Sequence, residues 1–236
     1  MTTDSQLVCE LYNSLEDDFL KIIKYIPLQE SHYNVWSFYL SSILLNTGST
    51  LASFFKNSLY SRVFDEIDNI AEYRSREDHN MDIFRKVYKA KYKIERKKIY
   101  ELKNFTSIIP YGPWNCDGSL DWWNSYTKIK HDRFEYKEKA SLKATLDALG
   151  GLFLSIVIHS DNIPILVDND VIKGGGPPKT YLKEVLVKGE PIEDFSGMPY
   201  YAKTKLFGYV YEIEGTTFTD ENDKNILSPS YPGYGW

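Results

Sequence analysis

Cysteine is scarce in this sequence, which has only Cys9 and Cys116 among its 236 residues. Neither belongs to the Cys-x-x-Cys spacing of zinc sites and redox motifs. A disulfide framework and a cysteine-based metal site are therefore excluded, and a reducing compartment, the cytoplasm, is expected. We expect no metal and no cofactor. The glycine-rich stretch at 174–180 cannot act as a phosphate loop, since Pro178 has no N–H to offer a phosphate.

Long apolar runs are also absent. The longest, from Leu152 to Ile158, is interrupted by Ser155 and is far shorter than the roughly 18–20 residues that span a bilayer. The acidic N-terminus lacks the basic start and apolar core of a signal peptide. The sequence therefore predicts no membrane segment and a cytoplasmic protein.

Apolar residues are nevertheless plentiful. Hydrophobic residues make up 42% of the chain and aromatic residues 15%, which is enough to build a core and excludes general disorder. The net charge of −5 is mild and argues against a protein that coats nucleic acid with its whole surface.

Apolar spacing predicts a mainly α fold: a bundle of about five or six helices with a small β-rich C-terminal appendage. The helical domain is expected at 1–160, and short strands with an aromatic, proline- and glycine-rich tail at 161–236. Apolar residues at helical spacing predict helices at 7–26, 33–45, 49–71, 81–105, 119–134 and 142–156. Short β-prone runs between turn residues predict strands at 163–167, 181–187 and 206–213.

Glycine interrupts two of these helical patterns. Gly48 is expected to interrupt the helical pattern between the segments 33–45 and 49–71. Gly150 and Gly151 fall inside the last one, where each costs about 1 kcal/mol of helix stability relative to alanine. We expect another helix to approach closely at that pair.

Positive charge is concentrated between residues 85 and 103. Nine basic residues stand there against two acidic ones, a net of +7 in a chain of net −5. Such a helix could follow a phosphate backbone, or it could be a solvated face paired with acidic neighbours. The residues predicted to bind nucleic acid are Lys89, Lys93, Arg96, Lys97 and Lys98.

The most specific segment is 122–133, with sequence WWNSYTKIKHDR. On a helix its residues divide between two faces. One face carries Leu120, Asn124, Thr127 and His131. The other carries Trp122, Tyr126, Ile129 and Arg133.

This segment resembles the HEPN superfamily of helical proteins, many of which are prokaryotic defence or toxin ribonucleases. Their motif is an arginine, often followed by asparagine, with a histidine four to six residues later. Tyr126-Thr127-x-x-Lys130-His131 is similar to a divergent Tyr-Asn-x-x-Lys-His version. The helical order of residues 7–160 agrees with the resemblance, but the motif covers this stretch alone.

The resemblance implies a homodimer that binds RNA or nucleotides and cleaves RNA without a metal ion. The candidate catalytic residues are His131, Arg133, Lys130, Tyr126 and Asn124. Histidine can transfer a proton near neutral pH. A cation can stabilise charge on phosphate, and since tyrosine stands at the arginine position, Lys130 or Arg133 would have to supply it.

Other readings of the same residues stay open, and the sequence does not decide whether the protein is an enzyme. Asn124, Thr127 and His131 could form a polar network between helices. The chain would then be a non-catalytic interaction or scaffold protein. A second Arg-x4-His spacing, Arg74 with His79, lies in a polar connection where no helix is expected to fix its geometry.

Overall fold

The computed structural model describes residues 4–173, 200–211, 224 and 226–227. These residues form seven α-helices and one five-stranded antiparallel sheet. The predicted class, mainly α with a small β-rich C-terminal part, is confirmed. The chain divides into a helical unit, 1–97 with 109–153, and a second unit, 98–108 with 154–236. The second unit thus includes a segment from the middle of the sequence.

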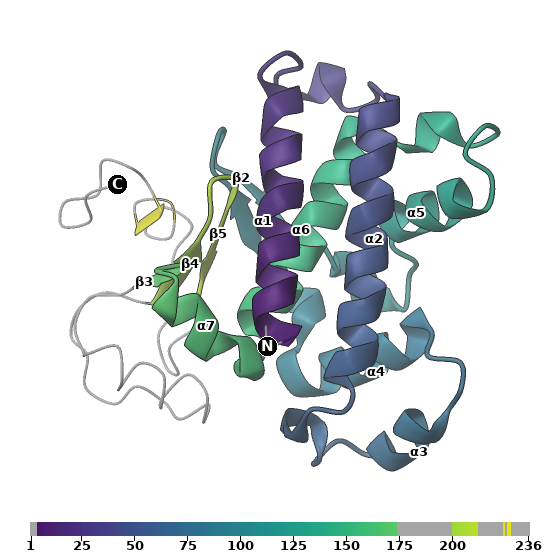
Figure 1. Ribbon diagram of the computed structural model, residues 1–236, viewed down its shortest axis with the longest axis vertical. Helices are drawn as coiled ribbons and strands as arrows, with labels where there is room; N and C mark the ends of the chain where they lie inside the picture. Colours follow the sequence, from purple (N-terminus) through teal and green to yellow (C-terminus); the bar gives the residue numbers. More distant parts are fainter. Residues whose placement is uncertain (1–3, 174–199, 212–223, 225, 228–236) are drawn as a thin grey trace. The chain divides into compact units, whose positions relative to one another are not determined.

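Figure 1 labels the helices along the chain. They are α1 Asp4–Ile23, α2 Phe38–Ser58, α3 Ile70–Ser75, α4 Met81–Tyr92, α5 Asp121–His131, α6 Leu142–Ile158 and α7 Ile163–Asp168. Side-chain caps begin three of them: Ser37 accepts a hydrogen bond from the backbone N–H of Leu40, Asn80 accepts those of Asp82 and Ile83, and Ser141 accepts that of Ala144. Such caps satisfy N–H groups that have no partner within the helix.

Two predicted helix boundaries are wrong. Gly48 does not separate two helical segments, because α2 runs through it without a break. The helix predicted at 81–105 ends at Tyr92, because Lys93 adopts a left-handed conformation with φ 50°. A short 3-10 turn, η3 Ile94–Arg96, follows, and the chain then becomes extended.

The prediction at 163–167 is also wrong, since this run forms the short helix α7. Pro164 stands in its first turn, where the fixed φ of proline suits a helix and its missing N–H costs nothing. The strand predicted at 206–213 is confirmed for Phe207–Val210. The strand predicted at 181–187 lies outside the described residues.

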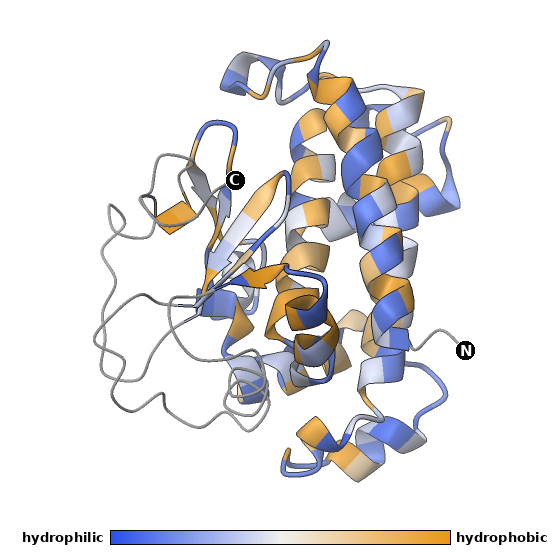
Figure 2. Cartoon of the chain, turned by 60° about the vertical axis from the view of Figure 1, so that its left-hand side comes forward, coloured by the Kyte–Doolittle hydropathy of each residue, from blue (hydrophilic) through white to orange (hydrophobic). Residues whose placement is uncertain are grey.

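The helical unit is built around α2, which packs against both α1 and α5. Helix α6 contacts α5 at Gly151 and α1 at Phe153. Polar and apolar residues alternate around the helices in the hydropathy colouring of Figure 2, as expected when one face is packed and another is in water. Helix α6 differs, since it is buried along its C-terminal half. Its apolar character agrees with this burial.

The sheet belongs to the second unit and has the order β2-β1-β5-β4-β3. The strands are β1 Ile99–Glu101, β2 Thr106–Ile108, β3 Ile172–Lys173, β4 Tyr201–Lys203 and β5 Phe207–Val210. Tyr100 pairs with Gly208. A Cβ at Gly208 would lie 2.7 Å from a methyl carbon of Leu227, so glycine at this position allows the Leu227 side chain to pack closely on the strand.

No single helix among the described residues is long and apolar enough to cross a membrane. The bent pair formed by α6 and residues 160–168 reaches that length and composition together.

Candidate functional site

Helix α5 carries the segment that the sequence singled out, and it ends at His131. Asp132 then closes a turn: its Oδ1 accepts hydrogen bonds from the backbone N–H groups of Phe134 and Glu135, at 3.0 and 2.9 Å. Arg133 therefore lies in this turn. The prediction that it shares a helix face with Tyr126 is wrong, because aspartate bonding to nearby backbone N–H groups competes with helix continuation.

The inner face of α5 is packed against glycines of two neighbouring helices. A Cβ at Gly48 of α2 would lie within 2.7 Å of three ring carbons of Tyr126. A Cβ at Gly151 of α6 would lie 3.0 Å from a ring carbon of Trp122. Close packing predicted at Gly151 is confirmed. Tyr126 is only 5% exposed, so its ring fills the core of the helical unit.

The outer face of α5 carries Asn124, Thr127 and His131. Asn124 donates to Ser119 Oγ at 3.0 Å, and Thr127 donates to the carbonyl oxygen of Trp123 at 3.0 Å. Both bonds are local to α5 and the residues before it. The exposed His131 makes no hydrogen bond to any described residue. Among the described residues, these three side chains therefore form no hydrogen bond with another helix.

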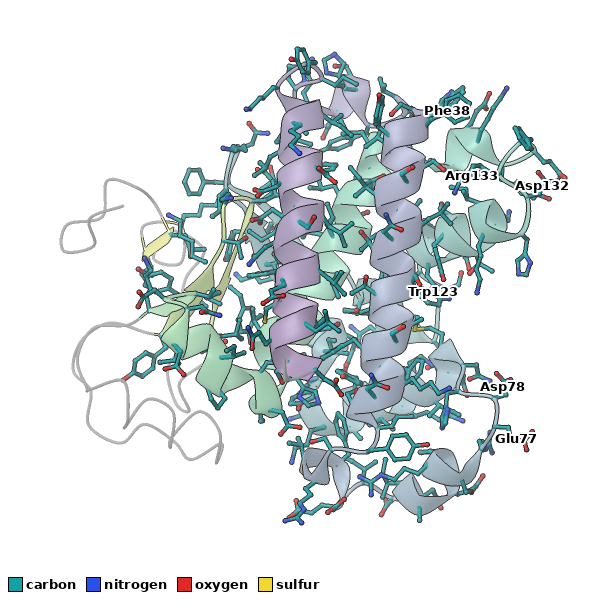
Figure 3. The ribbon with its side chains drawn as sticks, viewed as in Figure 1. Phe38, Glu77, Asp78, Trp123, Asp132 and Arg133 are labelled. Carbon is teal, nitrogen blue, oxygen red and sulfur yellow. The ribbon has the colours of Figure 1, made fainter. Side chains whose placement is uncertain are left out.

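Cations and aromatic rings gather where α5 ends. The amino group of Lys128 lies 5.6 Å from the ring centroid of Tyr136, and that of Lys130 lies 5.9 Å from Tyr126. Arg133 and Lys130 are exposed, as is Phe134, at 84%. Figure 3 shows Arg133 and Asp132 projecting outward from this turn.

The start of α2 adds two aromatic residues to the same region. Lys137, in the turn η5 Lys137–Lys139, lies 5.5 Å from the ring centroid of Trp36. Trp36 contacts Phe38 edge-on at 6.0 Å, and Phe38 is 61% exposed. The backbone explains this proximity, because Trp36 forms a β-bridge with Ser141.

We call this region the α5-end surface. Its residues are Lys128, Lys130, His131, Arg133, Phe134, Lys137, Trp36 and Phe38. The sequence analysis identified three of them, Lys130, His131 and Arg133, and did not identify the aromatic residues. An available signal was the alternation of aromatic and charged residues from Arg133 to Lys137, RFEYK.

The basic segment has a different geometry from the one predicted. Within α4, Asp82 pairs with both Arg85 and Lys86. Asp117 pairs with Arg85 at 3.3 Å and with Lys89 at 3.6 Å. Lys89 also donates to the carbonyl oxygen of Trp114 at 2.6 Å. Arg85, Lys86 and Lys89 therefore make contacts within and next to α4. This agrees with the alternative of a basic face paired with acidic neighbours.

The remaining predicted nucleic-acid-binding residues follow the end of α4. The left-handed Lys93 is exposed, and Arg96 is exposed with its Nε 3.6 Å from a Glu95 oxygen. Lys97 and Lys98 lie in the extended chain beyond η3, where the Lys98 amino group is 5.4 Å from the Tyr100 ring centroid. The expected single basic helix is therefore wrong.

The second Arg-x4-His spacing has a structural explanation. Arg74 donates to the carbonyl oxygens of Leu59 and Ser61, at 2.6 and 2.8 Å, and pairs with Asp65 at 2.9 Å. His79 bonds the carbonyl oxygen of Tyr73 at 3.1 Å. Arg74 thus satisfies carbonyl groups at the end of α2, which have no partner within the helix.

Among the described residues, no group of three or more His, Cys, Asp or Glu side chains could hold a metal ion. Comparisons of the chain with protein-family models, with curated proteins and with solved structures found no match.

Proposed function

We propose that this protein binds RNA at the α5-end surface, as a HEPN-like protein. One observation carries the proposal: Lys130, His131 and Arg133 are all exposed where α5 ends, and Arg133 directly precedes the exposed ring of Phe134. None of the three polar side chains makes a hydrogen bond to a described residue. Their donors are therefore available to a ligand. The proposal includes a cytoplasmic setting, which the two free cysteines support.

The chemistry of this surface suits a phosphate chain with accessible bases. Cations that neutralise phosphates supply most of the affinity for nucleic acid and make it fall with salt. Exposed aromatic rings can stack on unpaired bases. The most exposed ring of this surface, Phe134, directly follows Arg133 in the chain, so one ligand can contact both kinds of group.

RNA cleavage is the second candidate, and the accessibility of His131 favours it. A histidine on the surface can transfer a proton to or from a bound RNA, and Lys130 or Arg133 can stabilise the phosphate. The buried Tyr126 has no part in this mechanism. The HEPN resemblance adds a homodimer to the proposal, with residues of both copies meeting at the site.

Binding is tested by fluorescence anisotropy with labelled RNA at low and moderate salt. Lys130→Glu with Arg133→Glu should weaken binding more than about tenfold. Lys24→Glu with Lys56→Glu is the matched control: both are exposed lysines of the helical unit, so the change in net charge is equal. Lys93→Glu with Arg96→Glu tests the basic segment separately.

The outcomes separate the hypotheses. If the control pair weakens binding as much as the α5-end pair, net charge alone explains the affinity. If only the variant with Lys93→Glu and Arg96→Glu loses affinity for RNA, the binding site lies in the segment after α4. If wild type shows no salt-sensitive affinity for RNA, RNA binding is refuted and the non-catalytic scaffold alternative remains.

Cleavage is tested by incubating labelled RNA with wild type and with His131→Ala. The ribonuclease hypothesis expects cleavage by wild type, none by the variant, and equal RNA affinity for both. Since His131 is exposed, the variant should keep the thermal stability of wild type. A wild type that binds RNA and leaves it intact would restrict the function to binding.

A further inference from the structure

One face of the sheet in the second unit brings together residues of three strands. Side chains alternate between the two faces of a strand, so Tyr201 and Lys203 share one face of β4. Gly208 and Val210 likewise share one face of β5. Tyr201 pairs with Val210. Gly208 pairs with Lys203 on one side and with Tyr100 of β1 on the other, so this face continues across β1, β5 and β4.

Ile226 and Leu227 cover this face. Together with three buried residues of the sheet they form one apolar cluster, on which two partly buried residues pack. The rest of this cluster, together with the glycine beside it, we call the Gly208 patch; its residues are Tyr100, Leu102, Phe105, Tyr201, Gly208 and Val210. Ile226 and Leu227 lie outside the strands, and without them the patch would be an exposed apolar surface of the kind that marks binding sites.

The patch contacts both the side chain and the main chain of Leu227. A Cβ at Gly208 would lie 2.7 and 2.8 Å from the two methyl carbons of Leu227, and 3.2 Å from a methyl carbon of Leu102. The missing side chain of Gly208 therefore provides the space that the leucine fills. Lys203 Nζ donates a hydrogen bond to the carbonyl oxygen of Leu227 at 3.3 Å. In peptide recognition, main-chain hydrogen bonds supply affinity and side-chain contacts supply specificity.

We propose that the Gly208 patch is a peptide-binding site, which the chain's own Ile226 and Leu227 occupy and which takes a partner segment with two adjacent branched aliphatic residues. A ligand tethered to its site acts at an effective concentration of about millimolar. The tethered segment therefore excludes a free peptide that is present at a much lower concentration. A partner reaches the patch only when it displaces Ile226 and Leu227, so the site inhibits itself.

Fluorescence anisotropy of a labelled peptide with the sequence of residues 221–231, ENDKNILSPSY, tests the site on the full chain. Leu227→Ala removes the competing leucine, so this variant should bind the peptide at least about tenfold more tightly than wild type. Leu166→Ala is the matched control: it shortens another buried leucine of the second unit, 3% exposed, and should bind the peptide as weakly as wild type. Circular dichroism verifies that both variants are folded.

Two further comparisons locate the peptide. A peptide with alanine in place of its leucine should bind none of these proteins. Gly208→Ala in the Leu227→Ala chain should lower affinity for the original peptide at least about tenfold, because the added Cβ takes the space of the peptide's leucine. Unchanged affinity after Gly208→Ala overturns the proposal, since the peptide then binds elsewhere. So does a Leu227→Ala chain that binds the peptide no better than wild type or than Leu166→Ala.

A measurement on wild type needs no shortened core residue. At about millimolar concentration, where it competes with the tethered segment, a peptide with a photoreactive leucine should cross-link to β1, β4 or β5, as identified by mass spectrometry. Cross-links confined to other parts of the chain, or none at all, overturn the proposal. The result is independent of RNA binding, because the Gly208 patch belongs to the second unit and the α5-end surface to the helical unit.

Discussion

The contact between Gly48 and Tyr126 gives the sharpest test of the packing that positions α5. In a helix interior, alanine is more favourable than glycine by about 1 kcal/mol. Propensity alone therefore predicts that Gly48→Ala stabilises the protein. The structure predicts the opposite, because a Cβ would lie within 2.7 Å of three ring carbons of the buried Tyr126.

The magnitude follows from the two opposing effects. Real Cβ atoms essentially never approach another heavy atom within 3.0 Å, so the ring or a helix must move. Overpacking a core costs about 1–3 kcal/mol, and this contact, with three ring carbons, belongs near the upper end. After subtracting the gain in propensity, Gly48→Ala should lower the free energy of unfolding by about 1–2 kcal/mol.

Urea unfolding followed by circular dichroism measures the effect. Ser49→Ala is the matched control: the neighbouring residue of α2 is exposed, so its replacement should stabilise by about 0.5 kcal/mol through propensity. In a Tyr126→Ala background the clash is removed, and Gly48→Ala should become stabilising. A Gly48→Ala protein as stable as wild type would refute the packing argument.

Three further predictions concern other parts of the chain. Arg74→Met should lower the free energy of unfolding by about 1–3 kcal/mol, because the carbonyl oxygen of the buried Leu59 loses its donor. Arg76→Met should cost at most about 0.5 kcal/mol, since Arg76 makes an exposed ion pair, and equal effects would contradict this role. Burial lowers the pKa of His159 from 6.5 to about 4, so the unfolded chain binds its proton more readily. Stability should be complete above pH 6.5 and should fall by about 2 kcal/mol at about pH 5; that part of the loss should be absent from His159→Gln. Exposed Cys116 should react with a thiol reagent in the native protein, whereas Cys9, buried and with its pKa raised to about 12, should react only on unfolding.

The helices that the sequence predicted well are those whose apolar spacing is regular. Leu142, Leu146, Leu149 and Phe153 repeat at helical intervals, and α6 follows them. The end of α4 at Lys93 could not be predicted, because nothing in the sequence indicates that this lysine is left-handed. Isoleucine and leucine also continue the apolar pattern after it. The short strand β1 was therefore predicted as part of a helix, because the apolar spacing continues at helical intervals through it.

Gly48 shows why a local rule failed. Its cost in a helix is real, but the packing of Tyr126 against it offsets that cost. The partner lies 78 positions away in the chain, so no window of neighbouring residues could reveal it. Helix-breaking propensity was outweighed by tertiary packing.

The candidate site could be predicted in part. The helical wheel separated Trp122, Tyr126 and Ile129 from the polar face, and these three are buried. The turn that contains Arg133 depends on the side chain of Asp132, which accepts hydrogen bonds from the backbone N–H groups of Phe134 and Glu135. The exposed Phe38 and Phe134 could not be anticipated, because large aromatic residues are more often buried than exposed.

The strand pairing of the second unit has a consequence for how the chain is made. Tyr100 pairs with Gly208, which is 108 positions later in the sequence. During synthesis the β1–β2 hairpin emerges long before β5, so the buried residues Ile99 and Tyr100 wait without their sheet partner. Pairings between distant residues form slowly, and unpaired strand edges attract other chains. We therefore expect nascent chains that stop short of β5 to be the species most prone to aggregate in cells.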